Sequence, residues 1–112
     1  MSEQAQDAPH FYILADDLIW ATRLAGQGRT LGAQVTTLKG VAELRDLLLR
    51  GAVGTRDLIA IDTTTRVEEP IALVREAAAN GRVLALVQHD DPALRAAALE
   101  AGALRAMPYR AL

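Results

Sequence analysis

The stretch from Arg56 to Thr65 constrains the fold more than any other part of the chain. It reads Arg-Asp-Leu-Ile-Ala-Ile-Asp-Thr-Thr-Thr, with four apolar residues, Leu58–Ile61, between a charged start and a hydroxyl-rich end. A short, continuous apolar run indicates a strand that is covered on both faces, as central strands of parallel sheets are. Asp62 follows this run directly. We therefore expect Asp62 at the carboxyl end of the strand, where ligands and chemistry collect in open α/β sheets.

Strand and helix patterns alternate along the rest of the chain. Apolar or mixed runs of four or five residues indicate strands, and apolar residues at every third or fourth position indicate helices. The expected strands cover 11–15, 34–38, 58–61, 83–87 and 104–107, and the expected helices cover 18–31, 41–50, 68–80 and 92–101. Residues 1–10 are polar and are interpreted as a loose tail, so the folded domain is expected to span 11–112.

This strict alternation predicts an α/β fold, a doubly wound parallel sheet of five strands with right-handed crossovers. The first, third and fourth strands are uniformly apolar and belong in the middle, whereas the second and fifth have mixed polarity and belong at the edges. The flavodoxin-like order 2-1-3-4-5 satisfies both conditions. It makes the first and third strands neighbours, so Asp16, Asp17 and Asp62 are expected to meet at one rim of the sheet.

Composition limits the classes of function. The chain has 112 residues, no cysteine and a formal charge of −2. The absence of cysteine excludes disulfides and thiolate metal sites and fits a reducing compartment, so we expect a cytoplasmic location. The chain has no basic stripe, which disfavours nucleic-acid binding. Its apolar runs are far shorter than the roughly 20 residues of a membrane-spanning helix. We expect neither nucleic acid nor a membrane as a partner.

Three short segments occur together in an informative order. They are Tyr12–Asp17 (YILADD), Asp57–Asp62 (DLIAID) and Leu99–Ala103 (LEAGA). In this order they resemble the acidic pair, the phospho-acceptor strand and the Glu-Ala-Gly-Ala turn of CheY-like receiver domains of bacterial response regulators. The resemblance covers about 11–108 and makes 11–112 a receiver-like domain. It implies that Asp62 is the phosphorylated aspartate, and that Asp16, Asp17 and Asp62 hold Mg²⁺.

Physical chemistry agrees with the role that the resemblance gives to the three aspartates. Converging carboxylates repel one another, and a hard cation with oxygen ligands relieves that repulsion. An aspartate nucleophile can then form an acyl phosphate. The alternative is that Asp16, Asp17 and Asp62 cap helices and line solvated loops, because aspartate is common at strand-to-helix turns.

The sequence departs from the family pattern at two positions. The family has a serine or threonine at the end of the fourth strand, where this chain has Val87. It also has a lysine before a proline at the end of the fifth strand, where this chain has Met107 or, in a shifted alignment, Tyr109; Arg110 is a weak substitute. The only lysine is Lys39, after the second strand. Without a hydroxyl and an amine, a phosphoryl group is not converted into a conformational switch. We therefore expect a degenerate receiver, or pseudo-receiver.

The family also has a fifth helix beside the first, and we expect this helix to be missing or truncated here. The apolar surface left uncovered would be an interaction site for a protein partner or a second copy of the chain. The leading hypothesis is a receiver-like regulatory module in bacterial signalling that acts through protein contacts, is not an enzyme and has no productive phosphorylation switch. The alternatives are a genuine phospho-acceptor using Asp62 with magnesium, a structural assembly domain without a ligand, and a metal-dependent phosphate-ester enzyme using His89.

Overall fold

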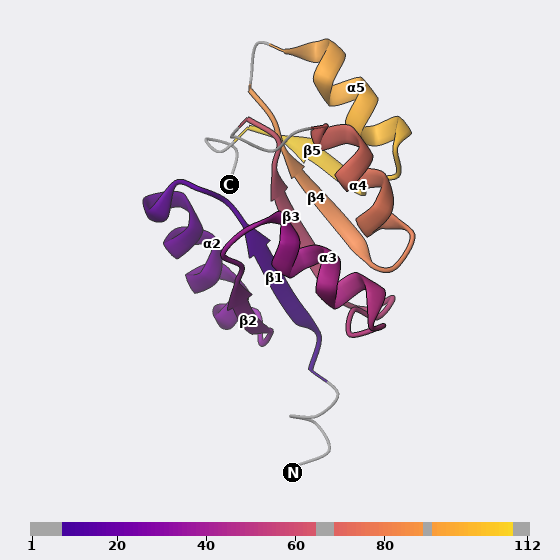
Figure 1. Ribbon diagram of the computed structural model, residues 1–112. Coiled ribbons are helices and arrows are strands. Elements are labelled where there is room, and N and C mark those ends of the chain that lie inside the picture. The colour runs from indigo at the N-terminus through magenta and orange to yellow at the C-terminus, as the bar shows by residue number, and fades with distance from the viewer. Residues whose placement is uncertain (1–7, 65–68, 89–90, 109–112) are drawn as a thin grey trace.

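The computed structural model describes residues 8–64, 69–88 and 91–108, in which strands and helices alternate as predicted (Figure 1). The strands are β1 (His10–Leu14), β2 (Gln34–Thr37), β3 (Leu58–Asp62), β4 (Arg82–Leu86) and β5 (Arg105–Met107), and the helices are α2 (Leu18–Thr30), α3 (Val41–Leu49), α4 (Pro70–Ala78) and α5 (Pro92–Glu100). Every expected strand and helix is confirmed, with ends that differ by no more than two residues. Residues 1–7 of the expected tail and the expected helix start at Glu68 lie outside the described residues.

The strands form one parallel sheet in the order β2-β1-β3-β4-β5. This is the predicted flavodoxin-like order, with the mixed-polarity strands β2 and β5 at the edges. β3 has β1 and β4 as neighbours, and all of its residues after Leu58 are buried. The expectation that this stretch forms the central strand is therefore confirmed.

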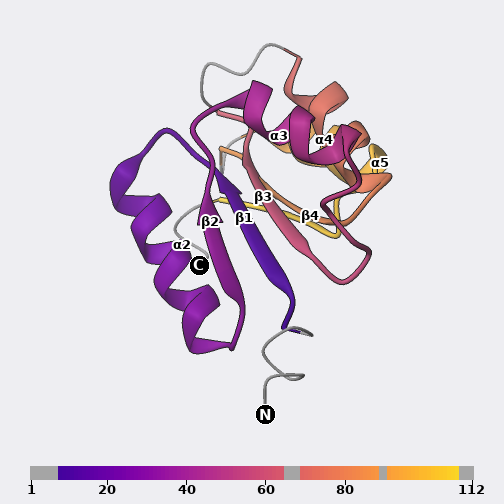
Figure 2. The same ribbon diagram turned by 60° about the horizontal axis from the view of Figure 1, so that its bottom comes forward.

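The described helices are divided unequally between the two faces of the sheet. Figure 2 shows α2 alone on one face and α3, α4 and α5 on the other. Successive side chains of a strand point to opposite faces, so the core is split into two clusters. The cluster on the three-helix face includes Leu44, Ile59, Ile61, Leu73 and Val83, and the smaller cluster on the α2 face includes Phe11, Ile13, Leu24, Ala60 and Leu86.

Aspartate caps fix the start of two helices. The carboxylate of Asp91 accepts a hydrogen bond from the amide of Leu94 at 3.0 Å, and Pro92 occupies the first turn of α5. Such a cap satisfies an amide that has no partner within the helix.

None of the helices described is long and apolar enough to cross a membrane.

Candidate functional site

Asp62 is the last residue of the central strand and is only 1% exposed. Its Oδ1 atom accepts two hydrogen bonds from Thr64, one from the amide at 2.9 Å and one from the hydroxyl at 2.6 Å. A carboxylate buried to this degree requires hydrogen-bond donors, and the turn after β3 supplies them. The carboxylate is thus held by its own loop.

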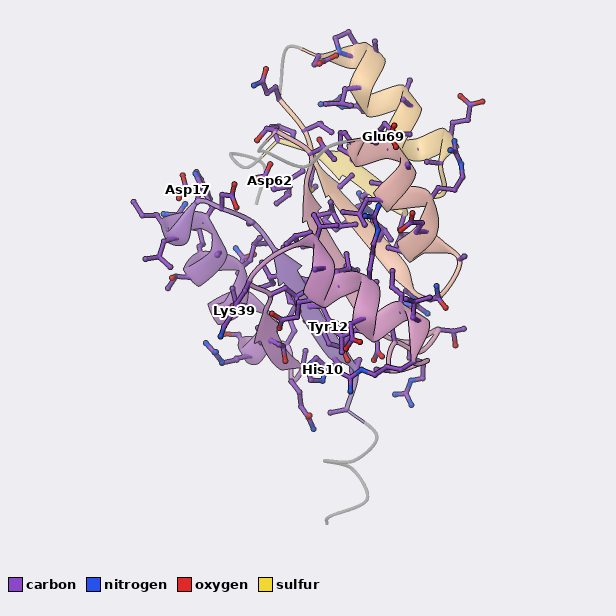
Figure 3. All side chains as sticks on the ribbon, in the orientation of Figure 1. His10, Tyr12, Asp17, Lys39, Asp62 and Glu69 are labelled. Carbon is purple, nitrogen blue, oxygen red and sulfur yellow. The ribbon has the colours of Figure 1, made fainter. Side chains whose placement is uncertain are left out.

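Asp16 and Asp17 follow β1 at the same end of the sheet, and both are exposed. The register pairs Leu14 with Ile61, so Asp62 comes directly after the last pair of the two strands. Figure 3 shows Asp17 at the start of α2, at the same end of the molecule as Asp62. The prediction that these acids lie at one rim is therefore consistent with the strand register.

Asp17 has a structural role at this rim. Its Oδ1 atom accepts hydrogen bonds from the amides of Ile19 at 3.0 Å and Trp20 at 3.2 Å, which makes it the N-cap of α2. The capping alternative is thus confirmed for Asp17.

The arrangement of these acids does not make a ready metal site. Within 8–64, 69–88 and 91–108, no group of three or more Asp, Glu or His side chains could hold a metal ion. The Asp17 carboxylate binds the first amides of α2 and the Asp62 carboxylate binds Thr64. Magnesium needs several oxygen ligands in near-octahedral geometry, so the carboxylates would have to rearrange to hold it. Magnesium binding by Asp16, Asp17 and Asp62 stays a prediction.

The end of β4 lies beside the end of β3, and the end of β5 lies beside that of β4. Val87, which follows β4, is 2% exposed, and its amide donates a hydrogen bond to the carbonyl oxygen of Met107 at 3.0 Å. Neither of these side chains has a hydrogen-bond donor. Thr63 does have a hydroxyl, but it donates to the carbonyl oxygen of Leu86 at 2.7 Å. These strand ends therefore present hydrocarbon and a thioether. Val87 stands where the sequence resemblance calls for a hydroxyl, and Met107 is one of the two positions, with Tyr109, where it calls for an amine.

The other candidate side chains do not join this rim in the part of the chain that is described. Lys39 follows β2 and is exposed, and its amide donates to the carboxylate of Glu43 at 3.1 Å. Figure 3 shows Lys39 well apart from Asp62. His89, Tyr109 and Arg110 lie outside the described residues.

The bonds from Thr64 were not predicted from the sequence. The available signal was the spacing itself, because an aspartate side chain commonly accepts hydrogen bonds from the residue two positions later. The three consecutive threonines at 63–65 obscure this signal, since any of them is a plausible turn residue.

Comparison with known proteins adds to this geometry. No family model matches the chain, and no curated protein matches it in sequence. Among solved structures, FixJ-N is similar with a TM-score of 0.75 and 15% identity, over 91% of this chain and 82% of that chain. The receiver domain of Klebsiella pneumoniae RstA, in a BeF3-activated form, is similar with a TM-score of 0.72 and 18% identity, over 89% of this chain and 85% of that chain. The chain has the receiver-domain fold.

A further solved structure with the receiver fold contains a phosphorylated residue and a metal ion. It is a response regulator from Burkholderia pseudomallei, with a phosphorylated aspartic acid, a calcium ion and citrate. Its TM-score is 0.71 at 18% identity, and the match covers 89% of this chain and 59% of that chain. At this identity the likeness establishes the receiver fold of this chain, and the chemistry at Asp62 has to be argued from its own residues.

Proposed function

We propose that this chain is a receiver-like regulatory module of bacterial signalling that acts through protein contacts, without a productive phosphorylation switch. The observation that carries the proposal is that Val87 and Met107, at the ends of β4 and β5, have side chains without a hydrogen-bond donor. The backbone hydrogen bond from Val87 to Met107 places the two residues side by side, and neither a valine nor a methionine side chain has a donor for a phosphoryl oxygen. A cytoplasmic location, expected from the cysteine-free sequence, is part of the same proposal.

A phosphorylation switch needs two groups of contacts that are hard to assemble here. Donors must meet the phosphoryl group, and those contacts must favour a second conformation of the domain. Val87 and Met107 offer no such donor. Thr64 also donates two hydrogen bonds to Oδ1 of Asp62, and such bonds lower the nucleophilicity of a carboxylate toward a phosphodonor. Both features favour a domain that stays in one state.

The sheet face that carries α2 supports a function through contacts. On this face Leu58, Leu84 and Met107 pack against the smaller core cluster but are only partly buried, and Leu104 nearby is 63% exposed. Contiguous apolar surface of this kind commonly marks a protein interaction site. A partner protein or a second copy of the chain would remove it from water.

Intact-mass spectrometry tests the proposed lack of phosphorylation. The chain is incubated with Mg²⁺ and a small acyl-phosphate donor, beside an active receiver domain that shows the donor to be competent. We expect no adduct on this chain. An adduct of one phosphate that disappears in Asp62→Asn would contradict the proposal.

The second candidate is a genuine phospho-acceptor that uses Asp62 with magnesium. The observation in its favour is the position of Asp62 at the end of the central strand, together with the phosphorylated aspartic acid of the Burkholderia pseudomallei neighbour. It predicts that Mg²⁺ shifts the NMR signals of Asp16, Asp17 and Asp62 in a saturable way. A titration without such shifts would favour the first candidate.

A further inference from the structure

A groove of about 360 Å³ lies on the sheet face that carries α2. It runs between the second half of α2 and the starts of β3 and β4, at the opposite end of β3 from Asp62. Its apolar lining includes Phe11, Leu24, Leu31, Leu58, Leu84 and Leu104. The groove is therefore separate from the rim of acidic residues.

The groove exists because α2 covers only one side of its sheet face. α2 packs against β1 and β2, and Gly28 allows it to lie directly on the ring of Phe11. No described helix covers β3, β4 and β5 on this face (Figure 2). As a result Leu31 is 85% exposed on one side of the groove and Leu104 is 63% exposed on the other.

The Arg, Lys, Asp and Glu residues that line the groove carry one sign of charge. Arg56 and Arg82 line it, and among the residues that the structure describes no acidic side chain does. Arg105 lies on the same face, because Met107 packs with the α2 cluster while Ala106 packs with the opposite one. All three arginines are exposed, and none is ion-paired with a described carboxylate.

We infer that this groove is the docking site of an amphipathic helix from a partner protein, with an apolar stripe for the leucines and acidic residues for Arg56, Arg82 and Arg105. The inference rests on the proposed function, since it names the partner chemistry of the same open face. A helix fits an apolar groove through side chains at i, i+3, i+4 and i+7, whereas an added strand would pair with a sheet edge, here β2 or β5.

Charge decides between a partner protein and a second copy. If two copies paired face to face, the same three arginines would approach each other, and like charges across an interface are costly. An acidic helix meets them with opposite charge instead. The same arginines repel helices rich in lysine, so the groove is expected to prefer acidic helices over basic ones.

Fluorescence anisotropy with two labelled synthetic peptides tests the charge requirement on the 112-residue chain. Both peptides are amphipathic helices with the same leucine stripe, and one carries Glu where the other carries Lys. We expect the Glu peptide to bind saturably and the Lys peptide to bind at least about tenfold more weakly. The double variant Arg56→Glu/Arg82→Glu should reverse this preference. The matched variant Arg75→Glu/Arg95→Glu, exposed on α4 and α5, should keep it.

The apolar requirement is tested with exposed leucines, because their replacement leaves the buried core intact. Leu104→Asp and Leu31→Asp should each weaken binding of the Glu peptide at least about tenfold, since both place a carboxylate at the groove. Leu49→Asp is the control, because Leu49 is 88% exposed on α3 at the other face. Circular dichroism of each variant checks that it is folded.

Three results would overturn the inference: equal affinity for the two peptides, equal loss in groove and control variants, or a concentration-dependent dimer that Leu104→Asp abolishes. The last result would identify a second copy as the occupant. The phosphorylation assay keeps this test separate from the proposed function. A phosphate adduct on Asp62 with retained peptide selectivity would contradict the proposed function and keep the docking site. No adduct and no peptide selectivity would contradict the docking site and keep the proposed lack of phosphorylation.

Discussion

Gly28 on α2 lies directly against the ring of Phe11 on β1. A β-carbon added at position 28 would stand 2.6 Å from Cδ2 of Phe11 and 3.1 Å from Cγ2 of Val35. Phe11 is buried, so its ring has little room to move. This close approach sets how near α2 lies to the sheet, and with it the position of one wall of the groove.

Gly28→Ala is therefore expected to lower the free energy of unfolding by about 1–3 kcal/mol, because the methyl group overpacks the contact between helix and sheet. Gly26→Ala in the same helix is the control. An added β-carbon there meets nothing within 4 Å, so the change should raise stability by about 0.5–1 kcal/mol through helix propensity. Urea denaturation measures both. Equal effects of the two substitutions would contradict the packing role of Gly28.

The bond from the Thr64 hydroxyl to Asp62 gives a second prediction. Thr64→Val keeps the side-chain shape and removes the hydroxyl that donates to a carboxylate that is 1% exposed. Because hydrogen bonds to charged groups contribute about 1.5–3 kcal/mol, we expect a loss of that order in the free energy of unfolding. Thr55→Val, at an exposed position, should change it by less than about 0.5 kcal/mol. Similar results for both variants in urea denaturation would show that the loop does not hold Asp62.

The elements and their order could be predicted because each strand carries its own signal. The apolar run Leu58–Ile61 indicates burial on both faces, and the mixed polarity of Gln34–Leu38 indicates an edge. Glycines and aspartates mark the helix ends, for example Asp91 before α5. These are local patterns of one chain segment, and together with the rules of strand connection they determine the topology.

The details of the rim could not be predicted in the same way. Whether carboxylates gather around a cation or bind neighbouring amides depends on side-chain directions within a few ångströms. Asp17 illustrates this, since one position after β1 serves equally well as a metal ligand or as a helix cap. The arginines of the groove were also missed, because Arg56 and Arg82, which line it, and Arg105, which pairs with Leu84 of its lining, are far apart in sequence and share a face only in the assembled sheet.

The two roles considered for Asp17 can be separated by substitution. Asp17→Ala removes the acceptor for the amides of Ile19 and Trp20, so the free energy of unfolding should fall by about 1 kcal/mol without any added metal. Asp17→Asn retains a capping oxygen and should lose much less. Asp16→Ala, next to it and exposed, should be nearly neutral. If Asp16→Ala and Asp17→Ala lose stability equally, and only when Mg²⁺ is present, metal binding and not capping is the role of the pair.

Tyr12 gives a prediction for alkaline pH. Burial raises the pKa of its hydroxyl above the ordinary value of 10.0, and the charge of Asp57 raises it further, while Arg50 acts in the opposite direction. Its ring also stacks on that of His10, with centroids 4.3 Å apart. The folded state thus holds the Tyr12 proton more tightly than the unfolded state does, so the stabilisation is complete below pH 10 and is lost as pH rises through the higher folded pKa.

Absorbance titration measures this directly, because tyrosine absorbs more strongly in the near ultraviolet when it ionises. The chain has two tyrosines, so Tyr109→Phe leaves Tyr12 as the only one. The midpoint of its titration in the folded protein should lie above 10.0 and should fall to the ordinary value in denaturant. Adding Tyr12→Phe in the same background should flatten the decline of the free energy of unfolding above pH 10, since the linked proton is then gone. The hydroxyl lies between β1 and the segment that follows α3, where it donates to the carbonyl oxygen of Ala52 at 3.5 Å. A midpoint at or below the ordinary value would contradict this burial.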